Sequence, residues 1–128
     1  MCLAVYLATV QPLPVVDRAP LVLEPAAEAT AARLRGHLSL PHLYFVASHE
    51  GCGCGFVLDH GEGTDEDCSE RQSSALALRA LLVEAAARGP AELLVCTDGC
   101  EAERPKVTRA FDPEAFEVRL GEHALIRL

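Results

Sequence analysis

The feature that most constrains this chain is an uncharged apolar run near its start, CLAVYLATV at residues 2–10. The run is rich in aliphatic and β-branched residues and lacks the polar alternation of a strand with one wet face. A continuous run of this kind is typical of a strand that is buried on both faces. We therefore expect residues 2–10 to form a central strand of a β-sheet.

Further strands are predicted where similar but shorter runs recur. These are LYFVAS at residues 43–48, ELLVC at 92–96 and a short strand at 21–23. The segment GFVLD at 55–59 is expected to return beside 43–48 as a hairpin, because the glycine-rich loop between them tolerates positive φ. The alternation in FEVRLGEHALIRL, residues 116–128, predicts a second hairpin that turns at Gly121 and Glu122.

Two helices are predicted between these strands. The first covers AAEATAARLR at residues 26–35, where Pro25 suits a first-turn position and Gly36 suits the end of a helix. The second and longer helix covers residues 69–88. Ser69 with Gln72 forms a capping-box pattern, and Gly89-Pro90 is a helix stop.

This order of elements predicts the fold class. It favours an α+β or α/β two-layer sandwich, with one mixed β-sheet of about five strands covered by two helices. The 128 residues suit a single domain spanning 1–128.

Composition narrows the range of partners. The formal charge of −8 repels phosphate backbones, and the basic residues are scattered rather than gathered in a stripe, so we expect no nucleic-acid partner. No apolar run approaches the roughly 18 residues needed to cross a bilayer, and the apolar start lacks the flanks of a secretory signal. We therefore expect a cytoplasmic protein without a membrane partner.

Six cysteines are many for a chain of this length, and two of them stand one residue apart in HEGCGCGF, residues 49–56. In a reduced compartment, clustered cysteines are more often metal ligands or reactive thiols than disulfides. Cys52 and Cys54 follow the 43–48 strand, and Cys96 and Cys100 flank the loop that leaves the 92–96 strand. If these strands run in the same direction, both loops emerge at one edge of the sheet.

The expected metal ligands are therefore Cys52, Cys54, Cys96, Cys100 and His49. Zinc is the expected ion, since it takes four thiolate or imidazole ligands, and an iron–sulfur centre is the less favoured alternative. If a coordination position stays open, Cys54, His49 and Glu50 are the candidate catalytic residues.

Two other interpretations use the same residues differently. In the first, Cys52 and Cys54 form a thiol pair for redox or sulfur-handling chemistry, with His49 as the nearest base. In the second, the protein is a small α+β binding or interaction domain, and its cysteines behave as small hydrophobic residues in a tight turn.

Two further features complete the predictions. Cys2 is interpreted as a residue at the start of the buried strand, apart from the ligand set. The 70–88 helix has apolar residues on two sides, one of which suits the sheet. The other side is expected either to contact the first helix or to form a homodimer interface. The sequence names no small-molecule ligand.

Overall fold

The computed structural model describes residues 2–14, 18–57, 65–119 and 122–128, with the backbone alone for residues 65–68. Its centre is a six-stranded sheet in the order β2-β3-β1-β4-β6-β5. The pair β5 and β6 is parallel, whereas the other neighbouring strands pair antiparallel, so the sheet is mixed. The strands are β1 (Leu3–Thr9), β2 (Val22–Pro25), β3 (His42–Ala47), β4 (Ala91–Thr97), β5 (Val107–Ala110) and β6 (Ala124–Arg127).

The strand predicted to be central is central. Every residue of β1 is buried, and β1 pairs with β3 on one side and with β4 on the other. Val5, for example, lies opposite both Val46 and Val95. The uncharged run reflects this position, because a strand enclosed on both faces has no side chain that reaches water.

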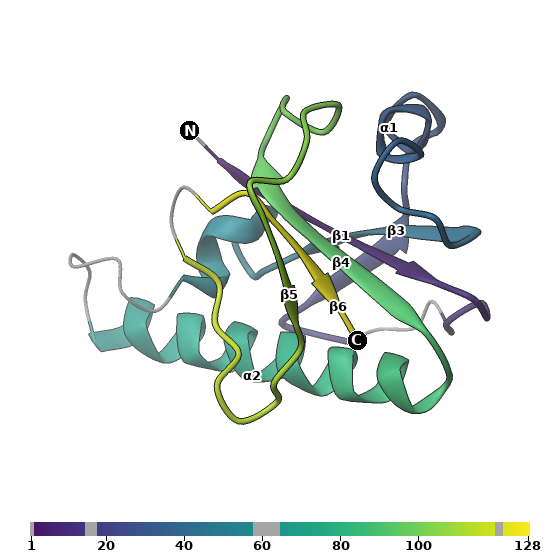
Figure 1. Cartoon of the computed structure of the whole chain (residues 1–128). Helices are drawn as coiled ribbons and strands as arrows, with labels where there is room; N and C mark the ends of the chain where they lie inside the picture. Colours follow the sequence, from purple (N-terminus) through teal and green to yellow (C-terminus); the bar gives the residue numbers. More distant parts are fainter. Residues whose placement is uncertain (1, 15–17, 58–64, 120–121) are drawn as a thin grey trace.

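The helices α1 (Glu28–Leu34) and α2 (Asp65–Ala87) lie on opposite faces of the sheet (Figure 1). Because successive strand residues point to opposite faces, β1 contributes Leu3, Val5 and Leu7 to the core under α2. The intervening residues of β1 pack with Leu34 in a second core on the α1 side. The predicted class, an α+β fold with one mixed sheet and two helices, is confirmed.

One stripe of α2 accounts for its packing on the sheet. Its buried residues are Ser74, Leu78, Leu81, Leu82 and Ala85. On the other side, Leu76 and Val83 are 56% and 47% exposed, and a homodimer through this side stays a prediction. The helix begins at Asp65, before the predicted start at Ser69. No helix in the described part of the chain is long and apolar enough to span a bilayer.

The prediction of a hairpin strand at 55–59 is wrong for residues 55–57, which the structure describes. Residues 53–56 form a short 3₁₀ helix, η1 (Gly53–Phe56), which leads toward α2 instead of returning beside β3. Phe56 and Val57 are buried in the core under α2, so their apolar character reflects packing and not strand pairing. Residues 58–59 lie outside the described residues.

The hairpin predicted at 116–128 is also wrong. Residues 116–119 form no strand, because Val118 is buried in the core under α2 and Phe116 packs edge-on against Phe111. The returning strand β6 pairs instead with β4 and with β5, a short exposed strand that the sequence did not reveal. Gly121, in the predicted turn, lies outside the described residues.

The connection after β4 is fixed to the α1 face by a buried acid. Glu101 is only 3% exposed, and its Oε1 accepts hydrogen bonds from the Tyr6 hydroxyl at 2.8 Å and from the Gly99 amide at 3.3 Å. Its Oε2 lies 3.9 Å from Arg33 of α1. Burial alone would raise the pKa of Glu101, but these hydrogen bonds and Arg33 lower it below its usual value.

Replacing this acid by Glu101→Gln is expected to reduce the free energy of unfolding at neutral pH by about 1–3 kcal/mol, because Tyr6 and Gly99 lose a charged acceptor. The lowered pKa means that the carboxylate stabilises the fold above its unfolded-state pKa, and that this stabilisation is lost as pH falls through the folded-state pKa. Denaturant unfolding at neutral and acid pH should therefore show the two proteins converging in acid. The control is Glu103→Gln, an exposed acid on the same connection. A difference that persists in acid would contradict this assignment.

Candidate functional site

The segment that follows β3 is a tight loop organised by Ser48. The Ser48 amide and hydroxyl both donate to the carbonyl oxygen of Cys52, at 2.9 and 2.6 Å, and the Ser48 oxygen atoms accept from the amides of Glu50 and Gly51. Gly51 has φ +83°, a conformation that other residues rarely adopt. These bonds reverse the chain and carry Cys52 back to the edge of the sheet.

Two glycines then let the loop lie directly against the central strand. A Cβ atom on Gly53 would lie 3.0 Å from both the Leu3 carbonyl oxygen and Val5 Cγ2. A Cβ atom on Gly55 would overlap the Ser48 hydroxyl. The glycines of GCGCG therefore permit close backbone approach, and this approach brings η1 and its Cys54 to the start of β1.

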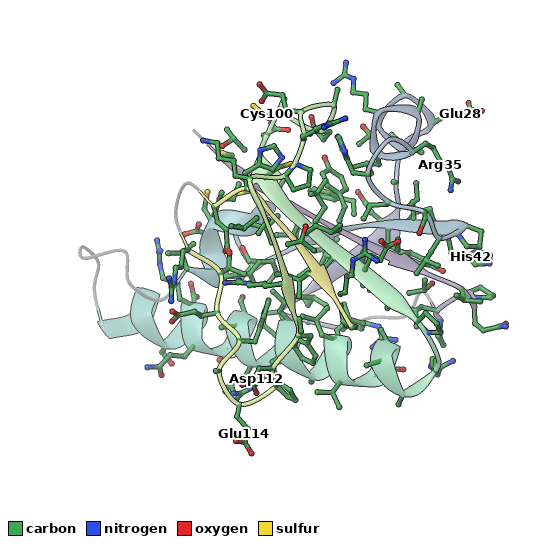
Figure 2. The ribbon with its side chains drawn as sticks, in the orientation of Figure 1. Glu28, Arg35, His42, Cys100, Asp112 and Glu114 are labelled. Carbon is green, nitrogen blue, oxygen red and sulfur yellow. The ribbon has the colours of Figure 1, made fainter. Side chains whose placement is uncertain are left out.

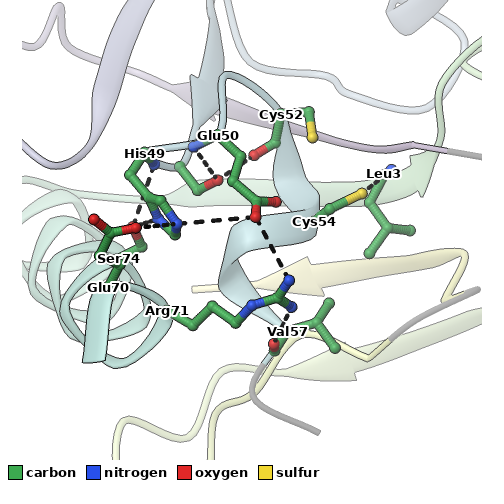
Figure 3. Close-up of polar contacts among 10 residues, drawn as sticks. Leu3, His49, Glu50, Cys52, Cys54, Val57, Glu70, Arg71 and Ser74 are labelled. Carbon is green, nitrogen blue, oxygen red and sulfur yellow. Dashed lines mark hydrogen bonds and ion pairs between the residues drawn. The ribbon is translucent and has the colours of Figure 1, made fainter. Parts of the chain in front are cut away.

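Three sulfur atoms meet at this point. The Sγ atoms of Cys2, Cys52 and Cys54 all lie within 4.8 Å of one another. The Leu3 amide donates a hydrogen bond to Cys54 Sγ at 3.3 Å, as Figure 3 shows. None of the three is in a disulfide, and Cys2 is exposed while the other two are half-buried. This group of three cysteines could hold a metal ion, and we call it the cysteine cluster.

The sheet topology explains why Cys2 joins the cluster. Because β1 is antiparallel to both β3 and β4, it starts at the end of the sheet where β3 and β4 finish. The Asp98 amide donates to the Cys2 carbonyl at 2.7 Å, which fixes Cys2 beside the end of β4. The sequence signal for this position was a cysteine directly before a strand predicted to be central, but the order of the strands was needed to use it.

The structure places Cys96 and Cys100 elsewhere: Cys96 lies in β4, and Cys100 lies on the connection that follows it (Figure 2). Cys96 is fully buried on the α1 side of the sheet, because its neighbour Val95 faces α2 and strand residues alternate. Burial, reinforced by Glu101, raises the pKa of Cys96 to about 12. The Cys100 amide closes a turn with the Thr97 carbonyl, and a hydrogen bond to Glu103 raises the pKa of its thiol. The structure therefore brings Cys52 and Cys54 together with Cys2 rather than with these two cysteines.

His49 is turned toward α2, away from the sulfur atoms (Figure 3). Its Nδ1 is hydrogen-bonded to the buried Ser74 hydroxyl at 2.7 Å, and its Nε2 lies 3.5 Å from Glu70. Glu50 lies 3.5 Å from Arg71, which also donates to the carbonyl of residue 57. In these positions His49 and Glu50 anchor the cysteine loop to α2.

While no cation is bound, the surroundings of Cys52 favour its neutral thiol. Burial raises the pKa of Cys52 to about 11, and the neighbouring Cys54 and Cys2 add to this effect by like-charge repulsion between thiolates. A bound cation would remove the repulsion and displace the thiol protons.

Comparison of the chain with protein-family models, with curated proteins and with solved structures returned no match.

The close approach of the loop to β1 can be tested with Gly53→Ala. The added Cβ meets the backbone of the central strand, which cannot shift cheaply, so the free energy of unfolding should fall by about 1–3 kcal/mol. Gly36→Ala is the matched control, because its Cβ would find only the Arg33 carbonyl oxygen, at 4.0 Å. Chemical denaturation in the presence of chelator isolates the packing effect from metal binding. Equal stability of the two variants would show that the loop does not depend on this contact.

Proposed function

We propose that this is a zinc-binding protein in which Cys2, Cys52 and Cys54 hold one ion at the edge of the sheet. The observation that carries the proposal is the separation of the three Sγ atoms, all within 4.8 Å of one another. Zn–S bonds of about 2.3 Å at tetrahedral angles require sulfur atoms about 3.8 Å apart. The upper bound of 4.8 Å exceeds this spacing by about 1 Å, and the exposed Cys2 has solvent around it in which to adjust.

The number of ligands favours zinc over an iron–sulfur centre. Within the described residues, the three cysteines are joined by no fourth histidine, cysteine or carboxylate. Clusters of iron and sulfur take four protein ligands as a rule, whereas zinc also occurs with three protein ligands and a water molecule. We assign Cys54 the role of a ligand, and His49 and Glu50 the role of positioning the loop.

An ion at this place would support the fold. It would link the start of the central strand to the loop after β3, two segments that otherwise share the Leu3–Cys54 hydrogen bond. The binding free energy of such an ion adds to the free energy of folding, because the unfolded chain offers no preformed site. The proposal also requires reduced thiols, as a cytoplasmic location would supply.

A thiol-redox function is the alternative that the structure supports less well. A reactive thiol needs a lowered pKa, whereas burial raises the pKa of Cys52 to about 11. The purely structural alternative is also less favoured, because Cys2 is exposed and Cys52 is half-buried, and of the three only Cys54 packs against the core under α2.

Zinc content of the purified chain tests the proposal. Metal-free protein mixed with zinc and desalted should retain about one ion per chain, and excess zinc at 100–1,000 times Kd should stabilise the fold by about 2.7–4.1 kcal/mol. Cys2→Ser, Cys52→Ser and Cys54→Ser should lose the ion. Cys100→Ser is the control and should keep it, since Cys100 lies outside the cluster.

Alkylation separates the proposal from the redox alternative. With zinc bound, the three cluster thiols should resist alkylation until chelator is added, whereas a redox pair would react at once. Zinc retention that is unaffected by Cys2→Ser would contradict the assigned ligand set. Failure of the wild-type chain to retain zinc would contradict the function itself.

A further inference from the structure

The strand β5 ends the sheet with an open edge. In the described part of the chain it pairs with β6 alone, and it lies at the front of the molecule in Figure 1. Three of its four residues are exposed, and Val107 is 55% exposed. An exposed strand edge offers unpaired backbone amides and carbonyls to another extended chain.

The opposite edge of the sheet is protected, which makes β5 stand out. There β2 carries Glu24 and Pro25, and proline lacks the amide needed to extend a ladder. Strand edges are commonly guarded by proline, by charge and by shortness. Of these guards β5 has shortness and a single charged residue, Arg109, but no proline.

The backbone of β5 is oriented to accept a further strand. The Phe111 amide, directly after β5, donates to the Arg127 carbonyl of β6 at 2.9 Å, so it points toward β6. Because successive amides of a strand alternate in direction, the Ala110 amide points away from β6, and so does that of Thr108. These two amides and their carbonyls lie on the side where the sheet has no further strand.

The side chains around this edge favour an acidic partner. A groove of about 510 Å³ beside β5 is lined by Val107, by the basic residues Lys106, Arg109 and Arg119, and by the acid Glu122. Arg109 and Arg119 are paired with Glu122 and Glu117, but Lys106 forms no ion pair within the described residues. The local excess of positive charge contrasts with the net charge of −8 of the whole chain.

The same charges argue against a second copy at this edge. Two β5 strands side by side would bring Lys106 and Arg109 of one copy against those of the other, and both copies carry a net charge of −8. An extended segment with alternating acidic and β-branched residues carries the complementary charge and favours the backbone conformation of a β-strand.

We propose that the β5 edge is a docking site for an extended acidic segment of a partner protein, which adds to the sheet as a seventh strand. Backbone hydrogen bonds to Thr108 and Ala110 supply affinity, and Lys106 with its basic neighbours selects acidic side chains. This proposal is independent of the cysteine cluster.

The probe is a short fluorescent peptide of alternating glutamate and valine, titrated with the full chain and followed by anisotropy. Amide NMR spectra of the chain should show chemical-shift changes confined to β5 and its neighbours. Binding of the peptide should weaken as salt is added. A peptide of alternating lysine and valine should bind about tenfold more weakly or worse. The glutamate peptide with methylated backbone amides should not bind, because it cannot form the ladder.

Variants at one outward position of β5 provide matched tests. Thr108→Pro removes an outward amide and should weaken binding about tenfold or more. Thr108→Ala keeps that amide at the same exposed position and should leave binding unchanged. Equal binding by Thr108→Pro and the wild type, equal binding of the methylated peptide, or shifts at β2 would each overturn the proposal. No binding of the glutamate peptide to the wild-type chain would also overturn it.

Discussion

The strand β1 pairs with β3 on one side and with β4 on the other, antiparallel in both cases, and all its residues are buried. A strand enclosed in this way leaves two apolar faces to cover, and each helix covers one of them. The same pairing fixes where the chain must enter the sheet. Cys2 arrives between the ends of β3 and β4, so the position of the cysteine cluster follows from the pairing of a single strand.

The loop after β3 is shaped to meet β1 at that point. Ser48 closes the turn, Gly53 permits contact with the backbone of Leu3, and the polar contacts of His49 hold the far side of the loop on α2. The result is a loop fixed on both sides before any ion is present. A preorganised set of ligands loses less conformational freedom on binding than a flexible one, which strengthens binding.

The sequence predicted the elements with strong local signals and missed those that depend on partners. The uncharged run at 2–10 identified the central strand, since nothing but burial on both faces suits it. The glycine and cysteine pattern located the loop of the site. The exposed strand β5 had no such signal. Val118 fitted the alternation of a strand, but it lies in a loop and is buried in the core under α2. In both cases, tertiary contacts decide the structure.

The ligand set illustrates the same limit at the level of a single residue. The predicted ligand set grouped Cys52 and Cys54 with Cys96 and Cys100, because loops that leave parallel strands at one end of a sheet were expected to share one space. The sheet itself separates them, because Cys96 follows Val95 in a strand and therefore faces α1. Both faces of β4 carry apolar residues, and its one charged residue, Glu92, which by alternation shares the face of Cys96, is itself buried. The sequence therefore does not mark which face Cys96 takes.

The place where the chain enters or leaves each strand, rather than the spacing of the cysteines, therefore determines which thiols meet. Cys2 precedes β1, and its carbonyl binds the Asp98 amide while its sulfur faces the loop after β3. A cation held there would join segments from the start of the chain and from the loop after β3, beside a hydrogen bond that already links Cys2 to the end of β4. Such a link closes long loops, and loops of this length gain most from closure because they are costly to order.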